Sequence, residues 1–256
     1  MNRLLLLIMA VALFACNESP KEAKLQLFLT DAPSDYDEVL IDVEDVRINV
    51  SSEDDDSGWR SLSDINSGVY NLLDFTNGLD TILGEYIMPA GKISQIRLVL
   101  GENNKVMVDG QYYDLDTPSA QSSGLKLNVH ADLEEGITYR MWLDFDAGRS
   151  IVEKGNGSYS LKPVIRTFTE AASGAIKGMV LPVDAKPYVM AITAAEDTFS
   201  TYADTVSGYF LVKGLEEGSY KVVLEPRNDD YSMMLIEDVM VDIGVVTDLE
   251  TINFDE

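Results

Sequence analysis

From Lys24 onwards, apolar and polar residues alternate along most of the chain, which is the period of half-buried β-strands. Runs such as LQLFL and IRLVL place an apolar side chain at every second position. In IDVEDVRINV the phase of the alternation slips between Val43 and Val46. We therefore predict a β-bulge at Glu44-Asp45. No segment carries a long 3.6-residue period, so we expect no helix of more than a turn or two.

Two further features indicate how the strands are connected. NKVMVDGQYYDL has Asp109-Gly110 between two strand-like runs, and this dipeptide favours a two-residue hairpin because both of its positions adopt positive φ. A small-residue segment, EAASG at 170–174, interrupts the alternation, which then resumes in short runs to the C-terminus. The pattern predicts an all-β protein with two antiparallel β-sandwich domains in tandem, over residues 24–170 and 174–256.

The N-terminus, MNRLLLLIMAVALFAC, has the pattern of an export signal. Arg3 supplies a positive charge, and the apolar stretch 4–13 is too short to span a membrane. The final letters, LFAC, resemble the lipobox of bacterial lipoproteins, which are cut just before a cysteine that carries acyl chains such as palmitate. The resemblance implies a lipoprotein signal peptide over residues 1–15, lipid attachment at Cys16 and a polar tether over residues 16–23.

The residue after Cys16 bears on the membrane in which such a lipoprotein would be anchored. Lipoproteins with Asp at this position stay at the inner membrane, whereas this chain has Asn17. The resemblance therefore implies the outer membrane, on its periplasmic face or at the cell surface. Two or three acyl chains would anchor the protein stably.

The charge of the chain limits its partners. Lys and Arg number 19 against 44 Asp and Glu, which leaves a net charge of −25. Because phosphate groups repel such a surface, nucleic acid is not an expected partner, and the membrane is expected to be reached only through the lipid anchor. One His and one Cys exclude a His/Cys-type zinc site and a disulfide within one chain.

Five blocks of sequence resemble a family of bacterial lipoproteins. In chain order, within residues 24–168, they are LFLTDAPSDYDEVLIDVEDVRI, NLLDFTNG, MPAGKISQIRLVLG, VMVDGQYYDLDTPSAQSSGLKL and WLDFDAGRSIVEKGNGSYSLKPVIR. The family is called domain of unknown function 4382, and the resemblance implies an exported β-sandwich-like domain of unestablished activity. Residues 174–254, with GAIKGMVLPV and DTVSGYFLVKGLEEGSYKVVLEP, resemble the prealbumin-like or carboxypeptidase-regulatory β-sandwich, a carbohydrate-binding-like fold. That likeness implies a non-catalytic module of secreted and surface proteins.

Asp144 and Asp146, in WLDFDAGRS, form the best candidate pair of carboxylates. They share one face of a predicted strand and lie roughly 7 Å apart. This separation suits a pair of glycosidase carboxylates, a calcium site, or a structural role in capping a loop or in salt bridges. The candidate partners for such salt bridges are Arg97, Arg140 and Arg149.

A calcium site and a Ser-His-Asp catalytic triad would each need further residues. Calcium would need a third ligand, for which Asp31 in TDAP is the candidate. The acidic run 53–56 lacks the Gly and terminal Glu of an EF-hand and is typical of a solvated loop tip. A Ser-His-Asp triad would have to use His130, whose place in LKLNVHADL indicates a position facing solvent or a sheet edge.

Tyrosine is frequent in the predicted strands, where such rings form sugar-binding platforms or pack half-buried against their neighbours. Examples are Tyr112, Tyr113, Tyr139, Tyr159, Tyr202, Tyr209 and Tyr220.

Together, the sequence features predict a lipid-anchored cell-envelope protein that is a non-catalytic binding or adhesion module for a glycan or a surface protein. The alternatives are a carboxylate-based hydrolase that uses Asp144 and Asp146, and a purely structural assembly subunit.

Overall fold

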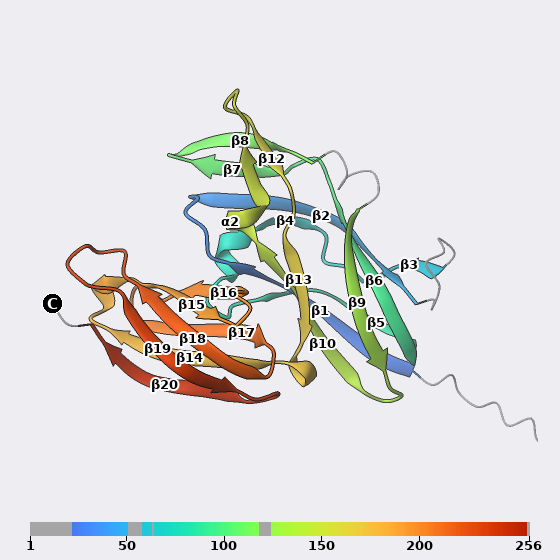
Figure 1. The fold of residues 1–256 in the computed structure, drawn as a ribbon. Helices are drawn as coiled ribbons and strands as arrows, with labels where there is room; N and C mark the ends of the chain where they lie inside the picture. The colour runs from blue at the N-terminus through green and yellow to red at the C-terminus, as the bar shows by residue number, and fades with distance from the viewer. Residues whose placement is uncertain (1–21, 51–57, 63, 118–123, 255–256) are drawn as a thin grey trace, which may run out of the picture.

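A computed structural model of the chain (Figure 1) describes residues 22–50, 58–62, 64–117 and 124–254. Nearly every regular element in these ranges is a β-strand, and the strands form four sheets. The predicted all-β class is therefore confirmed. The expected signal peptide, Cys16 and the acidic run 53–56 lie outside the described residues. Within the described ranges, no helix has the length and apolar character needed to cross a membrane.

Two of the sheets make up an N-terminal unit. The four-stranded sheet contains β1 (Glu22–Ala32), β5 (Thr81–Pro89), β10 (Thr138–Asp146) and β13 (Ile165–Thr169). The nine-stranded sheet contains β2 (Glu38–Asn49), β3 (Trp59–Ser61), β4 (Gly68–Asn71), β6 (Gly91–Leu100), β7 (Lys105–Val108), β8 (Gln111–Asp116), β9 (Leu125–Leu133), β11 (Ile151–Glu153) and β12 (Tyr159–Leu161). The strand orders are β13-β10-β1-β5 and β11-β12-β8-β7-β2-β6-β9, with β3 and β4 paired to β2.

The other two sheets make up a C-terminal unit. The three-stranded sheet has the order β17-β14-β20 and the four-stranded sheet the order β16-β15-β18-β19. The strands are β14 (Gly174–Leu181), β15 (Tyr188–Ile192), β16 (Thr198–Tyr202), β17 (Tyr209–Leu215), β18 (Gly218–Glu225), β19 (Met234–Val241) and β20 (Val246–Asn253). The helical segments among the described residues are all short: η2 (Leu72–Phe75), α2 (Ala147–Ser150), η3 (Glu170–Ala172) and η4 (Val183–Ala185). The turn η3 lies in the small-residue segment that joins the two units.

Each unit has a hydrophobic core of its own. In the N-terminal unit, Leu25, Leu27 and Leu29 of β1 are fully buried together with the alternate apolar residues of β2 and β6. In the C-terminal unit, Ile176 and Phe210 are fully buried. The two-residue alternation thus places one face of each strand in a core, which is the main stabilising contribution to both sandwiches.

Two local predictions are confirmed. The pairing of β2 with β6 shifts register between Val43 and Asp45, where an extra residue enters the strand. Asp109 and Gly110 join β7 to β8 with φ angles of 50° and 74°, the left-handed pair that a two-residue hairpin needs. Both features depend on neighbours in sequence, which is why the pattern alone indicates them.

The sheets differ from the expectation in strand direction. β1 and β10 are paired in parallel, and so are β8 and β12 and also β14 and β20, so three of the four sheets are mixed and not wholly antiparallel. An apolar alternation is the same in either direction, so it carries no information on this point. β1 also begins at Glu22, two residues before the expected boundary at Lys24.

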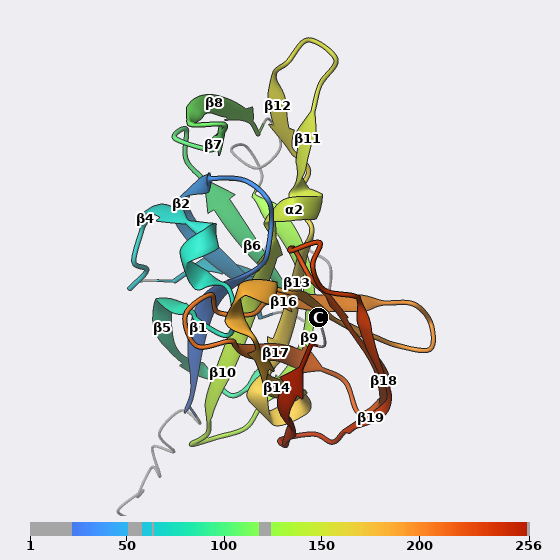
Figure 2. The same cartoon turned by 90° about the vertical axis from the view of Figure 1, so that its left-hand side faces the viewer.

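The C-terminal unit lies against the outer side of the four-stranded sheet of the N-terminal unit. In Figures 1 and 2, β16 and β17 lie beside β1, β10 and β13. The surface between the two units is called the junction below. Ligand sites in proteins often occur at such places.

Candidate binding site

Asn77 connects the two units through the edge of β17. Its Nδ2 donates to the carbonyl of Tyr209 at 3.0 Å, and its Oδ1 accepts from the N–H of Leu211 at 3.0 Å. The backbone of Asn77 is left-handed, with φ 55°, a conformation that Asn tolerates better than most residues. The side chain therefore satisfies an exposed strand edge as a neighbouring strand would.

Lys213 makes a second connection across the junction. Its Nζ donates to the carbonyl of Gly78 at 2.6 Å and lies 3.2 Å from Oδ2 of Asp80. The same Oδ2 accepts from Nε1 of Trp142 at 2.8 Å. A buried indole N–H and an ammonium thus share one carboxylate, which neutralises the charge of Lys213 at the junction.

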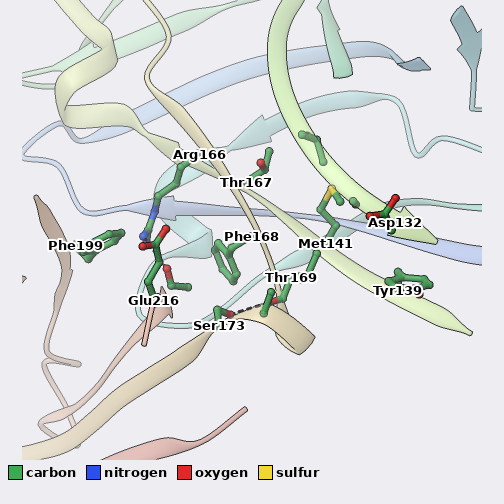
Figure 3. A pocket seen from close by; sticks show the side chains of 14 residues that line it. Asp132, Tyr139, Met141, Arg166, Thr167, Phe168, Thr169, Ser173, Phe199 and Glu216 are labelled. Atoms are coloured by element: carbon green, nitrogen blue, oxygen red, sulfur yellow. Dashed lines mark hydrogen bonds between the residues drawn. The ribbon is translucent and has the colours of Figure 1, made fainter. Parts of the chain in front are cut away.

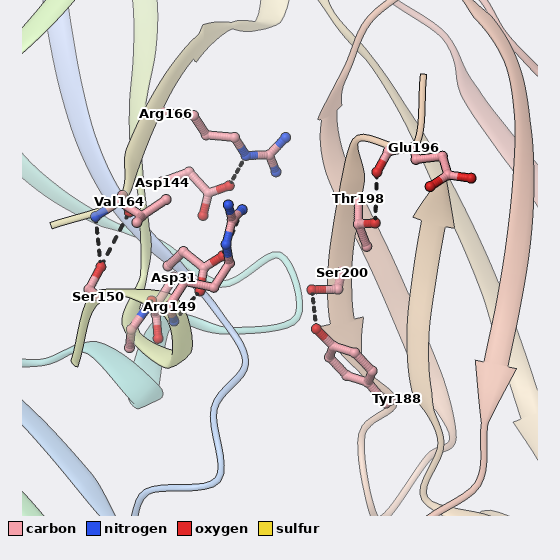
Figure 4. A network of polar contacts seen from close by, with 12 residues as sticks. Asp31, Asp144, Arg149, Ser150, Val164, Arg166, Tyr188, Glu196, Thr198 and Ser200 are labelled. Carbon is pink, nitrogen blue, oxygen red and sulfur yellow. Dashed lines mark hydrogen bonds and ion pairs between the residues drawn. The ribbon is translucent and has the colours of Figure 1, made fainter. Parts of the chain in front are cut away.

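Arg166 of β13 is the centre of a third connection (Figure 4). Its guanidinium pairs with the carboxylate of Asp144 and donates to the carbonyls of Lys213 at 3.2 Å and Gly214 at 3.3 Å. Its Cζ also lies 4.3 Å from the ring centroid of Phe199. The guanidinium of Arg166 thus binds the carboxylate of Asp144 and the backbone of the C-terminal unit at the same time. The carboxylate of Asp144 therefore contributes to the junction.

The three acidic candidates lie at the ends of two parallel strands. The register pairs Asp31 with Phe145, so Asp144 and Asp146 flank it on the neighbouring strand. Oδ1 of Asp31 accepts from the N–H of Ala147 at 3.0 Å, and Oδ1 of Asp146 accepts from the N–H of Arg149 at 2.9 Å. The structure thus brings together the residues that sequence analysis selected.

Burial dominates the electrostatics of this group. It raises the pKa of the Asp31 carboxyl well above its usual value of 3.8, and the charges of Asp144 and Asp146 add to the effect. Burial also raises the pKa of Asp146. Oδ2 of Asp31 is buried without a hydrogen-bond partner in the described part of the chain. The described residues contain no group of three or more acidic, His or Cys side chains arranged to hold a metal ion. The calcium site therefore stays a prediction.

Of the salt-bridge partners weighed from the sequence, Arg149 contacts a candidate carboxylate. Its Nη1 lies 3.8 Å from Oδ2 of Asp146. Asp144 instead pairs with Arg166, which lies 22 residues away in the sequence. Strand pairing between β10 and β13 places Arg166 directly opposite Asp144, and no local pattern could indicate that contact.

A cleft of about 640 Å³ opens at the junction beside Asp146. Tyr188 and Tyr202 of the C-terminal unit line it, and the loop after β1 contributes Tyr36 from the other side. Charged side chains surround these rings: Asp35, Asp146, Arg149, Glu225 and Arg227. We call this space the tyrosine cleft. Tyr202 is one of the seven tyrosines named from the sequence as either platform or packing residues, whereas Tyr36, Tyr188 and Arg227 were not named.

Hydrogen bonds hold two tyrosines of this cleft, Tyr188 and Tyr202, in place. The hydroxyl of Tyr188 donates to Oγ of Ser200 at 2.7 Å, and that of Tyr202 donates to Oδ1 of Asp35 at 2.9 Å. The two ring centroids are 5.2 Å apart. Burial and the bond to Asp35 raise the pKa of Tyr202 to about 12, so the phenol remains a neutral donor at physiological pH.

A second cleft, of about 470 Å³, lies elsewhere on the junction (Figure 3). β13 contributes residues 166–169 to its wall, and β9 contributes Val129, Ala131 and Asp132. Glu216 faces it from the C-terminal unit. We call it the β9–β13 cleft. His130 belongs to β9, but its side chain is not among the features that the structure describes, so the triad hypothesis stays untested.

The sequence model of one family, described as Domain of unknown function (DUF4382), matches residues 22–163. The chain belongs to this DUF4382 family. The match covers the strands that carry Asp31, Asp144 and Asp146 and ends before Arg166 and the C-terminal unit. No curated protein matches the sequence.

Solved structures give only distant likenesses. The Bacillus anthracis TIE protein is 9% identical, with a TM-score of 0.25 over 92% of this chain and 34% of its own. This chain therefore spans about a third of that protein. The minor pilin GBS52 of Streptococcus agalactiae is 10% identical, with a TM-score of 0.26 over 90% of this chain and 94% of its own. The major pilin subunit BcpA of Bacillus cereus is 10% identical, with a TM-score of 0.26 over 91% and 70%. Scores this low carry no argument about function.

Proposed function

We propose that this DUF4382 protein is a lipid-anchored, non-catalytic binding module of the cell envelope whose ligand is a glycan. The tyrosine cleft carries the proposal. It lies between two sandwich units, has the volume of a small-ligand site, and combines aromatic rings with charged groups of both signs.

The chemistry of the tyrosine cleft fits a sugar. The face of an aromatic ring packs against the apolar C–H face of a pyranose, and Tyr188 and Tyr202 supply two such rings at fixed positions. Sugar hydroxyls both donate and accept, so they can bond to Asp35 and Glu225 as well as to Arg227. The overall charge of −25 favours neutral glycans over acidic ones.

The contacts of Asp144 argue against a hydrolase. Asp146 lines the tyrosine cleft, but Asp144 does not and instead pairs with Arg166. The smaller space that both carboxylates line measures about 120 Å³, well below the ~300 Å³ at which small-ligand sites begin. The raised pKa of Asp146 is the one feature that favours the alternative, since a glycosidase needs a protonated acid.

A glycan microarray probed with the full chain tests the proposal. We expect binding to one class of neutral glycan, and we expect Tyr202→Ala to weaken it about tenfold because the ring surface is lost. Tyr202→Phe keeps the ring and should retain most of the affinity. Tyr112→Ala removes an exposed tyrosine outside the cleft and serves as the matched control. Binding that survives Tyr188→Ala and Tyr202→Ala together would exclude this cleft.

Two further measurements separate the alternatives. If the protein is a hydrolase, release of reducing sugar from the bound glycan should cease in Asp146→Asn while the fold is kept. If it is a purely structural subunit, we expect no glycan to bind.

The lipid anchor is tested separately from the ligand. Cys16→Ala should abolish labelling by palmitate and move the protein out of the outer-membrane fraction.

A further inference from the structure

β13 and β9 are edge strands of two different sheets. β13 ends the four-stranded sheet of the N-terminal unit, and β9 ends the nine-stranded sheet. The β9–β13 cleft lies where these two edges approach each other, with a volume of about 470 Å³ (Figure 3). A sandwich that is open along one side presents backbone groups there which pair with nothing in the sheet itself.

The ladder with β10 shows which backbone groups of β13 point into this opening. The N–H of Asp146 donates to the carbonyl of Val164, so the backbone of Val164 faces β10. Backbone direction alternates along an antiparallel strand, so Arg166 and Phe168 face β10 too, while Thr167 and Thr169 face away. The bond from Oγ of Ser173 to the carbonyl of Thr169 agrees with this alternation.

The outward groups on the edge of β13 are therefore the N–H and carbonyl of Ile165 and of Thr167, together with the N–H of Thr169, and those of Thr167 and Thr169 belong to residues that line the cleft. In the part of the chain that the structure describes, none of them has a hydrogen-bond partner in the protein. They repeat at the spacing of a strand, which is the arrangement that an added strand would satisfy.

The side chains of the cleft indicate the chemistry of such a strand. Val129, Met141 and Phe168 give it apolar walls. Figure 3 shows the carboxylate of Glu216 near Arg166, whereas Asp132 lies at the other end of the cleft. Arg166 pairs with Asp144, and Oδ1 of Asp132 lies 3.7 Å from Nζ of Lys92, so among the described residues Glu216 is the charged lining group outside these ion pairs and leaves the cleft negative. The whole chain also carries a net charge of −25, which repels a second copy.

We propose that the β9–β13 cleft binds an extended segment of a partner polypeptide, with alternating basic and apolar residues, by strand addition to β13. Backbone hydrogen bonds to Thr167 and Thr169 would supply affinity, and the acidic side chains would select the charge of the partner. This site shares no lining residue with the tyrosine cleft, so it is independent of the proposed glycan site.

Amide hydrogen exchange of the full chain tests this site directly. The probe is a short blocked peptide in which Lys and Thr alternate with Val, at millimolar concentration. We expect the amides of Thr167 and Thr169 to exchange about tenfold more slowly in its presence. A peptide with Glu in place of Lys should protect them much less. If the Lys peptide leaves both amides unprotected, the proposal is wrong.

Two controls separate strand addition from other modes of binding. N-methylation of alternate peptide residues removes the donors on one edge of the peptide and should abolish protection without altering the protein. Thr167→Pro removes an outward N–H, a change that edge strands accept, whereas Thr167→Val keeps that N–H. We expect about tenfold weaker binding for the Pro variant and near-normal binding for the Val variant. Equal binding of the N-methylated and unmodified peptides would overturn strand addition even if Thr167→Pro fails to fold.

Discussion

Oδ1 of Asn77 accepts a hydrogen bond from the N–H of Leu211 at 3.0 Å, and its Nδ2 donates at the same distance to the carbonyl of Tyr209. One side chain of the N-terminal unit thus replaces a strand at the edge of β17. That edge is satisfied within the molecule, whereas the edge of β13 is left open to the β9–β13 cleft.

Removal of the Asn77 amide should weaken the junction. We expect Asn77→Ala to lower the free energy of unfolding by about 1–3 kcal/mol, because two hydrogen bonds are lost and φ is positive at this position. Asn77→Asp keeps the acceptor for Leu211 and should cost less. Urea denaturation measures the loss, and limited proteolysis around residues 170–174 should become faster if the two units separate. An unchanged midpoint for Asn77→Ala would show that the contact contributes nothing.

Arg166 should contribute more to the free energy of unfolding than its partial exposure suggests. Arg166→Met leaves Asp144, which is 7% exposed, without its partner, and we expect a loss of about 3 kcal/mol, the lower end of the range for a broken buried pair because Arg166 itself is 35% exposed. Asp144→Asn should cost less, since it removes the buried charge. A double-mutant cycle between these variants measures the coupling. Additive effects would mean that the two residues act independently.

Asp31 should make stability depend on pH. Its pKa in the folded protein is raised above the unfolded value, so its contribution to stability is fully present below about pH 3.9 and is lost as pH rises through the folded pKa. Above the unfolded pKa, the burial of the Asp31 carboxyl therefore opposes folding. We expect Asp31→Asn, which keeps the acceptor for Ala147, to raise the unfolding midpoint at pH 7–8 and to have little effect near pH 4. A variant that is destabilised equally across this range would contradict the assignment.

Calcium binding at Asp31, Asp144 and Asp146 can be tested by thermal unfolding in EDTA and in millimolar Ca²⁺. A ligand that binds only the folded state raises the midpoint by mass action. We expect no shift, because Arg166 already neutralises Asp144. A rise of several degrees that is lost in Asp146→Asn would instead establish the calcium site.

Local features of the fold could be predicted because short segments contain their causes. The alternation around Leu27, the phase slip before Asp45 and the Asp109-Gly110 turn each act through neighbours in sequence. The acidic candidates Asp31, Asp144 and Asp146 were also selected from the sequence, and the parallel register of β1 and β10 brings them together.

Tertiary structure decided the roles of these residues. Asp144 contributes to the junction because strand pairing places Arg166 opposite it. The hydroxyl of Tyr202 donates to Asp35, which lies 167 residues away in the sequence. Hydrophobic periodicity reports which face of a strand is buried, but not which strand lies beside it or in which direction it runs. The sequence therefore determined the strands, the turns and the charge of this protein. The long-range packing of its two units decided the clefts, the ion pairs and the open edge of β13.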